Sequence, residues 1–338
     1  MKTYQIIYEK LQASIDYISG ESLAQELNLS RTSIWKAIQH LEKEGLVIDS
    51  VKNRGYKLLS GDLFLPDWIE KHSPVRVHFN PQSSSTQLDA KKGMEAGNPA
   101  DSLYLASQQT VAQGRFGRHF YAPNQGGIYM SLHLQPNLPF DELPPYTILT
   151  AASIYQAILN LTGIETKIKW VNDIYLEGKK VAGILTEAIT SVETGLVTDV
   201  IIGIGLNFAI QKFPDELKDK ATSLFFGSAP ISRNDLIAEI WRIFYQTDEE
   251  ELIQTYKAQS FILGRTITFD KKGFTYTGKA LTLSNNGHLL VELTDGQQMW
   301  LTSGEISLTS WWENDNLTPA LLLLNGSLFF TGFLFENY

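Results

Sequence analysis

The sequence predicts an α+β protein built from a winged helix-turn-helix, a central domain with a mixed sheet, and a small C-terminal β-barrel. The first 60 residues have the pattern of three helices followed by a strand hairpin. The middle of the chain alternates irregularly between strands and helices, and the region after residue 261 alternates apolar and polar side chains around tight turns. The expected segments are 1–60 for the winged helix, 61–74 for a linker, 75–260 for the central domain, 261–310 for the barrel and 311–338 for an unassigned tail.

Length and composition are typical of a globular protein with more than one domain. The chain has 338 residues, of which 43% are hydrophobic and 19% charged, which is enough apolar mass for a substantial core. It has no cysteine, so disulfides and thiolate metal sites are excluded. The first residues carry no apolar signal stretch, and a cytoplasmic location is therefore expected.

The net charge of −9 is unevenly distributed. Residues 1–60 hold eight Lys/Arg and seven Asp/Glu, a net charge of +1, so the acidic excess lies in the rest of the chain. This balance argues against a general nucleic-acid binder but leaves a local DNA contact by the first domain open.

The N-terminal domain is predicted element by element from periodicity and caps. Apolar residues at helical spacing mark the first helix, and Ser30 is placed to cap the third. The expected elements are helices over residues 3–15, 22–27 and 31–44 and strands over residues 46–51 and 55–59. The apolar stripes are Ile6, Ile7, Leu11 and Ile15 in the first helix and Ile34, Ile38 and Leu41 in the third.

This arrangement favours contact with DNA. In a helix-turn-helix the second helix of the pair presents its N-terminal outward residues to the major groove, and basic residues at the wing tip contact phosphates. The candidate DNA-binding residues are Arg31, Thr32, Ser33, Lys36, Lys52 and Arg54. The alternative is that the domain serves dimerisation or docking and that these charges are simply solvated. With so few cations, DNA affinity should be modest and sensitive to salt.

The central region predicts a largely antiparallel or mixed sheet, because two strand pairs join through tight turns at Glu177-Gly178 and at residues 193–195. The expected strands cover residues 75–80, 103–108, 127–134, 167–170, 181–187 and 197–206, and the expected helices cover residues 89–95 and 146–161. Ser232-Arg-Asn-Asp235 has the form of a capping box that opens another helix. In the C-terminal region, Asn-Gly and Asp-Gly turns at residues 286–287 and 295–296 indicate the barrel.

Four segments carry candidate chemistry. Residues 108–118, directly after a strand, contain Gly114 and Gly117, which allow close approach to a ligand, and Arg115 and Arg118, whose forked donors suit carboxylate or phosphate. The loop is not a Walker loop, because it lacks the Gly-Lys-Ser/Thr ending. The alternative is that residues 108–118 form a solvent-exposed turn that binds no ligand.

The other three segments are Lys169-Trp-Val-Asn-Asp-Ile-Tyr175, Lys179-Lys-Val-Ala-Gly-Ile-Leu185 and Gly203-Ile-Gly-Leu-Asn207. The polar residues of the Lys169–Tyr175 segment are better suited to a binding site than to a hydrophobic core. The alternative is a hairpin whose polar side chains point to solvent. In the second, strand alternation predicts Lys180 and Ala182 on one face and Val181 and Gly183 on the other. A lysine facing the ligand would be a point charge for phosphate or a developing oxyanion. The third segment begins like a dinucleotide fingerprint, but it has neither the third glycine nor the following helix.

Together and in this order, a glycine-arginine loop, Lys-Trp-x-Asn-Asp, Lys-x-Ala-Gly-Ile and Gly-x-Asn resemble the biotin–protein ligase family. With the winged helix in front, the chain resembles the bifunctional members, the biotin operon repressors, over about residues 1–310. The resemblance implies a central ligase domain related to lipoate ligases, followed by an SH3-like barrel. It also implies a reaction in which biotin and Mg-ATP form biotinyl-5′-AMP and a lysine of a biotin carrier domain then accepts the biotinyl group.

The resemblance also implies roles for individual residues. Lys180 and Arg115 would be catalytic, and Mg²⁺ would enter with ATP, with Asp173 as a further ligand. The biotin-binding residues would be Ser85, Thr86, Gln109, Gly114, Arg115, Phe120, Lys180 and Gly183. The ATP-binding residues would be Arg118, Asn172, Asp173, Lys180 and Asn207. The expected partners are the biotin carrier domain of biotin-dependent carboxylases, operator DNA through residues 1–60, and a second copy of the chain when adenylate is bound; no membrane partner is expected.

The chain departs from the family pattern in three places. Ala112 and Gln113 stand where the family loop commonly begins Gly-Arg, so one cation fewer should weaken retention of the adenylate by about 1–3 kcal/mol. Thr309 follows residues 304–308 where some members carry arginine. In the tail, the apolar run over residues 320–335 is shorter than the roughly 20 residues needed to span a bilayer, which favours a flexible or partner-seeking tail.

Three classes of function are compatible with this resemblance and these departures from it. The first is a ligase that also represses transcription, the second a ligase whose winged helix is only structural, and the third a ligand-sensing transcription factor without catalysis. A lipoate ligase is a further enzymatic alternative, disfavoured by the winged helix and by Lys-Trp-x-Asn-Asp.

Overall fold

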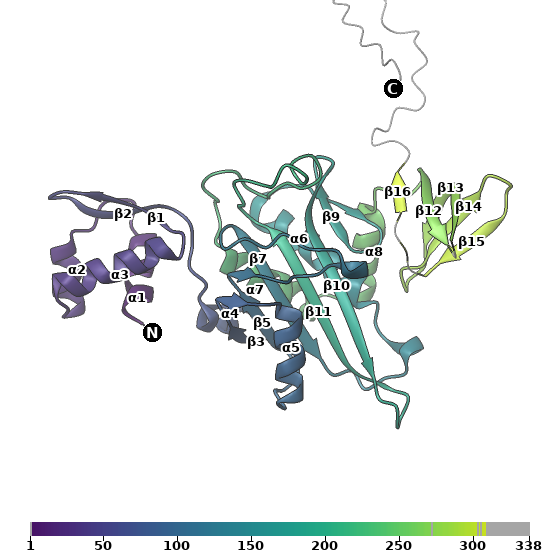
Figure 1. Ribbon diagram of the computed structural model, residues 1–338, viewed down its shortest axis with the longest axis horizontal. Coiled ribbons are helices and arrows are strands. Elements are labelled where there is room, and N and C mark those ends of the chain that lie inside the picture. The colour runs from purple at the N-terminus through teal and green to yellow at the C-terminus, as the bar shows by residue number, and fades with distance from the viewer. Residues whose placement is uncertain (1, 272, 303, 305, 309–338) are drawn as a thin grey trace, which may run out of the picture.

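The computed structural model describes residues 2–271, 273–302, 304 and 306–308, and Figure 1 shows its three parts in chain order. The apolar run at residues 320–335 and Thr309, both singled out in the sequence, lie outside the described residues. No helix in the described part of the chain has the length and apolar character needed to cross a membrane.

The winged helix-turn-helix forms as predicted. Its elements are α1 (Thr3–Gln12), α2 (Gly20–Leu27), α3 (Arg31–Lys43), β1 (Val47–Val51) and β2 (Gly55–Ser60), and the two strands pair antiparallel. Ser30 caps α3, because its hydroxyl accepts a 3.0 Å hydrogen bond from the Ser33 backbone N–H. The stripe residues Ile34, Ile38 and Leu41 are buried. The first helix ends at Gln12, so including Ile15 in its stripe was wrong: Ile15 is 87% exposed, beyond a turn in which Ser14 bonds the backbone of Asp16.

The central domain contains a seven-stranded mixed sheet in the order β3-β5-β7-β11-β10-β9-β8. Only β3 and β5 run parallel within it; the other neighbours are antiparallel. The seven strands are β3 (Arg76–Phe79), β5 (Ser102–Ala106), β7 (Gly127–Leu134), β8 (Lys167–Lys169), β9 (Asp173–Leu176), β10 (Lys179–Thr190) and β11 (Val197–Asn207). A short parallel pair, β4 (Gln82–Ser83) and β6 (Gln108–Gln109), lies outside this sheet.

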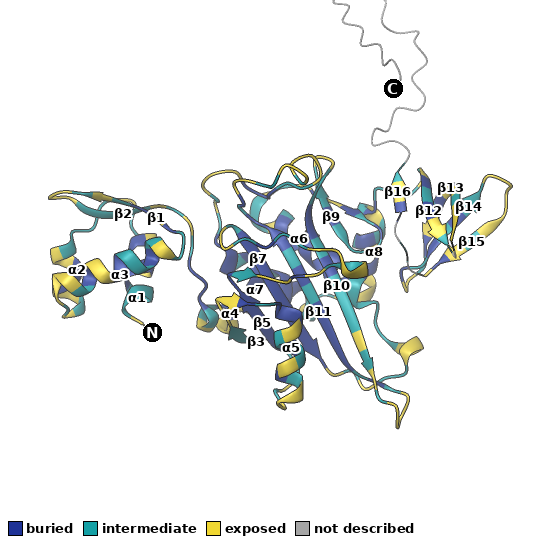
Figure 2. Cartoon of the chain, viewed as in Figure 1, coloured by how far each residue is buried: buried dark blue, intermediate teal, exposed yellow. Residues whose placement is uncertain are grey.

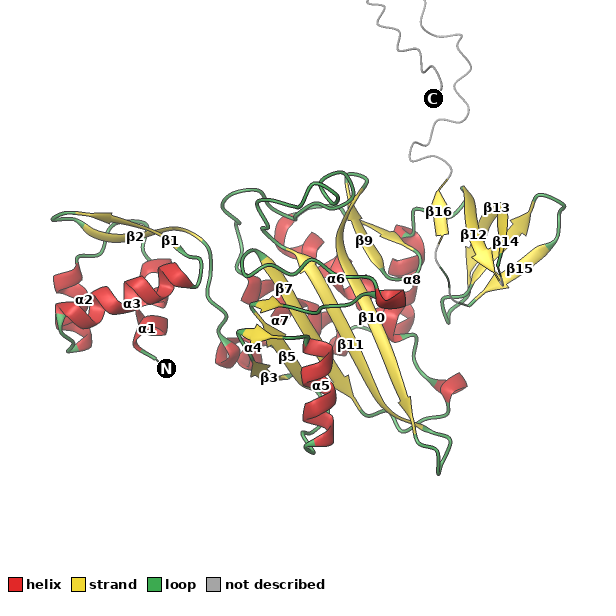
Figure 3. Ribbon diagram, viewed as in Figure 1, coloured by secondary structure: helices red, strands yellow, loops and turns green. Residues whose placement is uncertain are grey.

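Helices cover the two faces of the sheet unequally. Leu103 and Leu105 of β5 belong to the main core with the apolar faces of the larger helices, whereas Tyr104 packs with Ala90 of α5 on the opposite face. Figure 3 shows α5 in front of the sheet and the larger helices behind it, and Figure 2 shows the buried strands between them. The helices of this domain are α5 (Thr86–Glu95), α6 (Tyr146–Thr162), α7 (Arg233–Gln246) and α8 (Glu249–Gln259), with 3-10 turns η1 (Arg115–Gly117) and η2 (Phe140–Glu142).

Two of these helices differ from expectation. The helix expected over residues 89–95 begins three residues earlier, at Thr86. Helix α8 was not predicted, because its first turn is the acidic run Glu249–Glu251 and only Leu252, Ile253 and Tyr256 are buried. The capping box of α7 is present as predicted: Ser232 Oγ accepts from the Asp235 N–H, and the Asp235 carboxylate accepts from the Ser232 N–H.

The C-terminal domain is a five-stranded antiparallel sheet in the order β15-β14-β13-β12-β16, as expected for the SH3-like barrel. Its strands are β12 (Thr266–Lys271), β13 (Phe274–Leu283), β14 (Leu289–Leu293), β15 (Gln298–Leu301) and β16 (Ile306–Leu308). It contacts the central domain where the Trp170 indole N–H donates a 2.8 Å hydrogen bond to the Gly287 carbonyl.

The segment between the winged helix and the sheet is held by α7. The carboxylate of Asp62 forms an ion pair with Arg233, and the side chain of Asn234 bonds both Leu63 O (2.8 Å) and Leu65 N (2.9 Å). Leu63 and Leu65 also pack into the core of the winged helix. Helix α4 (Pro66–His72) follows. The residues expected to act as a linker are therefore packed against both neighbouring domains.

Candidate functional site

A cavity of about 290 Å³ lies on the α5 side of the central sheet, and residues widely spaced in the sequence line it. They come from the start of α5, the loop after β6, strands β9, β10 and β11, the segment before α7, and the C-terminal domain. Every residue predicted for a small-molecule site is among them: Ser85, Thr86, Gln109, Gly114, Arg115, Arg118, Phe120, Asn172, Asp173, Lys180, Gly183 and Asn207. The four sequence segments thus meet around one cavity.

The charge of the lining is opposite to that of the protein. Among the described lining residues the only carboxylate is Asp173, whereas the lysines and arginines are Arg115, Arg118, Lys169, Lys180 and Lys220. The chain as a whole carries a net charge of −9. Cations gathered around a cavity in an acidic protein indicate a site for anionic ligands, whose mutual repulsion the lining can reduce.

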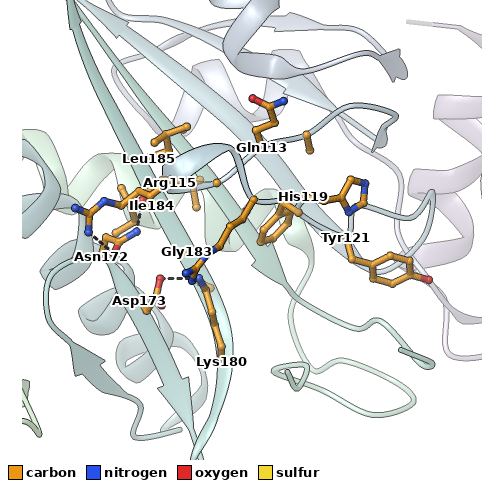
Figure 4. A pocket seen from close by; sticks show the side chains of 18 of the residues that line it. Gln113, Arg115, His119, Tyr121, Asn172, Asp173, Lys180, Gly183, Ile184 and Leu185 are labelled. Atoms are coloured by element: carbon orange, nitrogen blue, oxygen red, sulfur yellow. Dashed lines mark hydrogen bonds and ion pairs between the residues drawn. The ribbon is translucent and has the colours of Figure 1, made fainter. Parts of the chain in front are cut away.

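Two of these cations are held by adjacent residues. Nζ of Lys180 lies 2.6 Å from Oδ1 of Asp173, and Nη1 of Arg115 donates a long hydrogen bond of 3.4 Å to Oδ1 of Asn172 (Figure 4). Asn172 is fixed in turn, because its Nδ2 donates to the Ile184 carbonyl at 2.7 Å. Arg115 and Lys180 therefore converge on one wall of the cavity from two different chain segments.

Strand alternation around Lys180 was predicted wrongly. Lys180 pairs with Tyr175 and Ala182 with Ile174, so Val181 is an extra residue in the ladder, a β-bulge. The bulge cancels the alternation of faces at this point. As a result Lys180 and Gly183, expected on opposite faces, lie side by side in the cavity, as Figure 4 shows.

Gly183 makes room for the side chain of Lys180. A Cβ atom at position 183 would lie 2.9 Å from both Cε and Nζ of Lys180, which is closer than such atoms approach in proteins. The expected role of this glycine, close approach of a ligand, is untested, but its contact with the lysine is direct.

Replacing Gly183 with alanine should therefore displace the ammonium of Lys180 from Asp173. The methyl group meets the end of a flexible side chain rather than backbone, so we expect the fold and the urea midpoint to be nearly unchanged. The reaction that the sequence resemblance implies, adenylate formation, should then slow about 10²-fold, as for a reacting group misplaced by about 1 Å. Single-turnover formation of adenylate measures the effect, and a wild-type rate in this variant would contradict the assigned contact.

The loop that carries Arg115 is a hairpin over the cavity. Gln113 and His119 form an antiparallel bridge, Gly114 N–H donates to Arg118 O at 2.8 Å, and Phe120 N–H donates to Ala112 O at 3.0 Å. Nη1 of Arg115 also donates to the Gly304 carbonyl of the C-terminal domain at 3.1 Å. The hairpin thus bridges the central sheet and the C-terminal domain.

A neutral polar cluster forms another part of the lining. Thr86 N–H donates to Oε1 of Gln109 at 2.7 Å, and the hydroxyl of Ser131 lies 2.9 Å from that of Thr86. Ser85, Thr86 and Ser131 are buried, at 7%, 4% and 0% exposure. Buried hydroxyl and amide groups of this kind recognise an uncharged polar ligand group through hydrogen bonds.

Some lining residues were missed in the sequence. Ser131 is hidden within an apolar strand, and the only signal for it is a hydroxyl amid aliphatic neighbours. Gly205 lies in the Gly-x-Gly segment, and the ring of Phe120 covers it, since a Cβ there would lie 2.4 Å from Cζ of the ring. No motif around Lys220 marks it as a site residue. It lies in the cavity lining because its backbone carbonyl accepts a 2.9 Å hydrogen bond from the Lys180 N–H. Asn207, by contrast, was predicted: it is buried in the lining, and its side-chain amide donates to Thr222 O at 3.0 Å.

The candidate DNA-binding residues lie on α3 and the wing. Thr32 and Lys36 are exposed on α3, and Lys52 and Arg54 are exposed at the wing turn. Ser33 is half-buried, with its hydroxyl 2.8 Å from that of Ser30. This face therefore offers fewer outward polar groups than the sequence suggested.

Two of the basic residues on this face already have partners. Arg31 forms a 3.0 Å ion pair with Glu21, and the guanidinium of Arg54 lies 4.1 Å from the ring centroid of Tyr17. Trp35, which the sequence analysis did not select, is 53% exposed one turn after Arg31 and Thr32 and adds an apolar group to the same face.

Comparisons with known proteins agree with the arrangement of domains. Residues 3–57 match a helix-turn-helix domain model, residues 79–207 the biotin/lipoate A/B protein ligase family, and residues 262–309 the biotin protein ligase C-terminal domain. The bifunctional ligase/repressor BirA of Bacillus spizizenii is 36% identical over 301 residues, spanning 84% of this chain and 92% of that protein. BirA of Escherichia coli K12 is 26% identical over 317 residues, spanning 89% and 95%.

A solved structure is similar over about two thirds of the chain. The biotin protein ligase of Aquifex aeolicus, in complex with biotin and ATP, has a TM-score of 0.57 and 29% identity. The match covers 69% of this chain and 97% of that one. That structure was solved with both biotin and ATP bound.

Proposed function

This chain belongs to the biotin protein ligase family in its bifunctional ligase/repressor form, and on that premise we propose that the cavity around Arg115 and Lys180 activates biotin with ATP. The enzyme joins the biotin carboxylate to the α-phosphate and forms biotinyl-5′-AMP with release of pyrophosphate. A lysine of a biotin carrier domain of a carboxylase then attacks the acyl carbon, an amide bond forms, and AMP leaves. The same protein acts as a biotin-responsive transcriptional repressor.

One observation carries the proposal: Arg115 and Lys180, 65 positions apart in the sequence, contact the neighbouring residues Asn172 and Asp173 in one cavity. The first step brings together a carboxylate and a polyphosphate, which repel one another. Fixed cations and N–H donors lower that repulsion and stabilise the charge that moves onto phosphate in the transition state.

The remaining lining residues divide between the two substrates. The neutral cluster of Ser85, Thr86 and Gln109 holds the uncharged ring system of biotin through hydrogen bonds. Gly114 and Gly183 let the chain approach the ligand, and Phe120 packs against it as the loop closes. Arg118, Asn172, Asp173 and Asn207 bind ATP.

Mg²⁺ enters with ATP. Among the described residues no group of three or more His, Asp or Glu side chains gathers to hold a metal ion, and Asp173 is the carboxylate that lines the cavity. This donor set fits Mg²⁺, which is commonly bound through one or two carboxylates together with substrate phosphates and water. Asp173 would hold it, and the ion would supply neutralisation of phosphate charge.

The test is direct detection of the intermediate. The purified protein is incubated with biotin, magnesium and ATP labelled at the α-phosphate, and labelled biotinyl-AMP and pyrophosphate are measured. We expect both products with biotin and neither when biotin is left out or replaced by lipoate. Adenylate formed from lipoate instead of biotin would overturn the substrate assignment, and absence of both products would favour a ligand-sensing transcription factor.

The repressor activity is assigned to residues 1–60. The exposed residues Thr32 and Lys36 enter the major groove, Ser33 supports the start of α3, and Arg31, Lys52 and Arg54 contact phosphates. The adenylate-bound protein forms a homodimer, which matches the two-fold symmetry of an operator.

A gel shift tests this assignment against a ligase with a purely structural winged helix. The probe is DNA upstream of a biotin-synthesis or biotin-uptake gene, with and without biotin and MgATP. We expect a complex that strengthens when adenylate forms. Equal, salt-sensitive binding to unrelated DNA under both conditions would favour the structural role.

A further inference from the structure

One row of residues on the central sheet leaves room for the side chain of Gln87. Ser131 of β7, Gly203 of β11 and Leu185 of β10 are neighbours in a row across these three strands. A Cβ atom at position 203 would lie 2.6 Å from Oε1 of Gln87. The absence of a side chain at Gly203 therefore makes room for Gln87, which is the second residue of α5 and only 9% exposed.

The surroundings of Gln87 determine which end of its amide faces which neighbour. Its Nε2 donates to a carboxylate oxygen of Glu187 at 2.9 Å and lies 3.3 and 3.4 Å from the backbone carbonyl oxygens of Ile201 and Leu185. All three groups are acceptors only, so the nitrogen of the amide must face them. Lys91 pairs with the other carboxylate oxygen of Glu187 at 3.0 Å, and this ion pair holds the carboxylate in place.

The oxygen of the same amide faces Ser131, and this contact sets the direction of a hydroxyl hydrogen. Oε1 of Gln87 lies 2.8 Å from Oγ of Ser131. A carbonyl oxygen can only accept and a hydroxyl has one hydrogen to donate, so the hydrogen of Ser131 points to Gln87. If it pointed elsewhere, the buried oxygen of Gln87 would lose its donor, which is costly. The oxygen of Ser131 is then an acceptor for its other neighbour, the Thr86 hydroxyl at 2.9 Å.

The direction set at Ser131 continues into the cavity. When Thr86 donates its hydroxyl hydrogen to Ser131, the oxygen of Thr86 keeps its lone pairs for a ligand N–H. Beside it, Oε1 of Gln109 accepts from the Thr86 backbone N–H at 2.7 Å, so the nitrogen of that amide is the end that can donate to a ligand carbonyl. An acceptor beside a donor matches an N–H group next to a C=O group, as in the cyclic urea of biotin.

We propose that Gln87 is a positioning residue for biotin recognition: through Ser131, it orients the Thr86 hydroxyl as an acceptor for an N–H of the urea ring. The inference rests on the proposed function and adds a residue that acts on substrate recognition through another side chain. The sequence alone did not single out Gln87, because a glutamine in the first turn of a helix carries no signal of its own. Its role follows from contacts with β7 and β10, which lie far from it in the chain.

Gln87→Met tests the proposal in the full-length protein. Methionine keeps the length of the side chain beside Gly203 but removes the acceptor for Ser131, so the hydroxyl hydrogens of Ser131 and Thr86 can turn toward the ligand N–H. We expect the Kd for biotin, measured by calorimetry without ATP, and the KM for biotin to rise about tenfold, the usual scale for one lost hydrogen bond. The kcat of adenylate formation should stay within about twofold of wild type, because the lost interaction is made equally before and in the transition state.

A double-mutant cycle with Ser131 separates positioning from a structural role. If Gln87 acts through Ser131, Ser131→Ala should lose about as much biotin affinity as Gln87→Met, and the double variant should lose no more than Ser131→Ala alone. Gln82→Met is the matched control. Gln82 is exposed, lies shortly before α5 and is not among the described residues that line the cavity, so this variant should bind biotin as the wild type does.

The outcomes are distinguishable. A wild-type Kd for biotin in Gln87→Met overturns the proposal, and so do additive losses in the double variant or a fall in kcat at unchanged KM, because Gln87 would then act apart from Ser131. Ser131→Ala is the smaller change and tests the same route even if Gln87→Met does not fold: wild-type affinity in this variant also overturns the proposal. A wild-type protein that binds no biotin overturns the proposed function instead.

Discussion

Lys180→Ala is expected to lower the rate of adenylate formation by at least about 10²–10³-fold, the loss typical when one stabilising group for developing charge is removed. Nζ of Lys180 is the cation paired with Asp173 at 2.6 Å, and it lines the cavity on the same side as Arg115. Without it, Asp173 would lose its ion-pair partner, and one fixed cation fewer would face the incoming phosphates. Single-turnover assays with labelled ATP measure the loss.

The neighbouring lysine provides the control for Lys180→Ala. Nζ of Lys179 donates to the Lys218 carbonyl at 2.8 Å, and Lys179 is not among the residues that line the cavity. Lys179→Ala should therefore keep the wild-type rate, and both variants should keep the wild-type circular dichroism spectrum. Adenylate formed at the normal rate by the Lys180 variant would remove this residue from the mechanism.

Asp62→Ala is expected to destabilise the protein by about 3–5 kcal/mol, the usual cost of removing one partner of a buried ion pair. The side chains of Asp62 and Arg233 are only 11% and 8% exposed. The guanidinium would keep its bonds to Gly127 O and to the Asp62 backbone carbonyl, but it would remain a buried charge without a counterion. Urea denaturation followed by tryptophan fluorescence measures the change.

Two further variants identify the cause of that loss. Asp67 is exposed in the same connecting segment, so Asp67→Ala should change stability by less than about 1 kcal/mol. The double variant Asp62→Leu with Arg233→Met removes both charges and should recover part of the stability. If the double variant were no more stable than Asp62→Ala, an unpaired buried charge would not be the cause.

Most of the fold could be predicted because its signals are local. The hydroxyl of Ser30 caps α3, Ser232 and Asp235 form the box that opens α7, and tight turns join the hairpins where Gly178 and Gly195 stand. Such features act over a few residues, so they can be recognised in the chain itself. The two predictions that failed also concern local features. The apolar periodicity of α8 was too weak to predict a helix, and the turn at Ser14 ends α1 earlier than expected.

The sequence predicted which residues line the candidate site, but not how their side chains are arranged. All twelve small-molecule residues line one cavity, because the order of their motifs resembles that of a known family. Their contacts could not be derived from that order. Alternation along β10 predicted Lys180 and Gly183 on opposite faces, and the bulge at Val181, which depends on pairing with β9, reverses this.

By itself the sequence determined the three kinds of domain and the caps and turns, because propensity and periodicity act between near neighbours in the chain. The candidate site residues came from the resemblance of their motifs to those of a known family. Only the tertiary structure decided which of these residues meet. Arg115 contacts Asn172 across 57 positions, Arg233 pairs with Asp62 across 171, and Gln87 meets Ser131 across 44. These contacts depend on how the sheet, the loops and the winged helix pack, and packing brings together segments whose local preferences carry no information about one another.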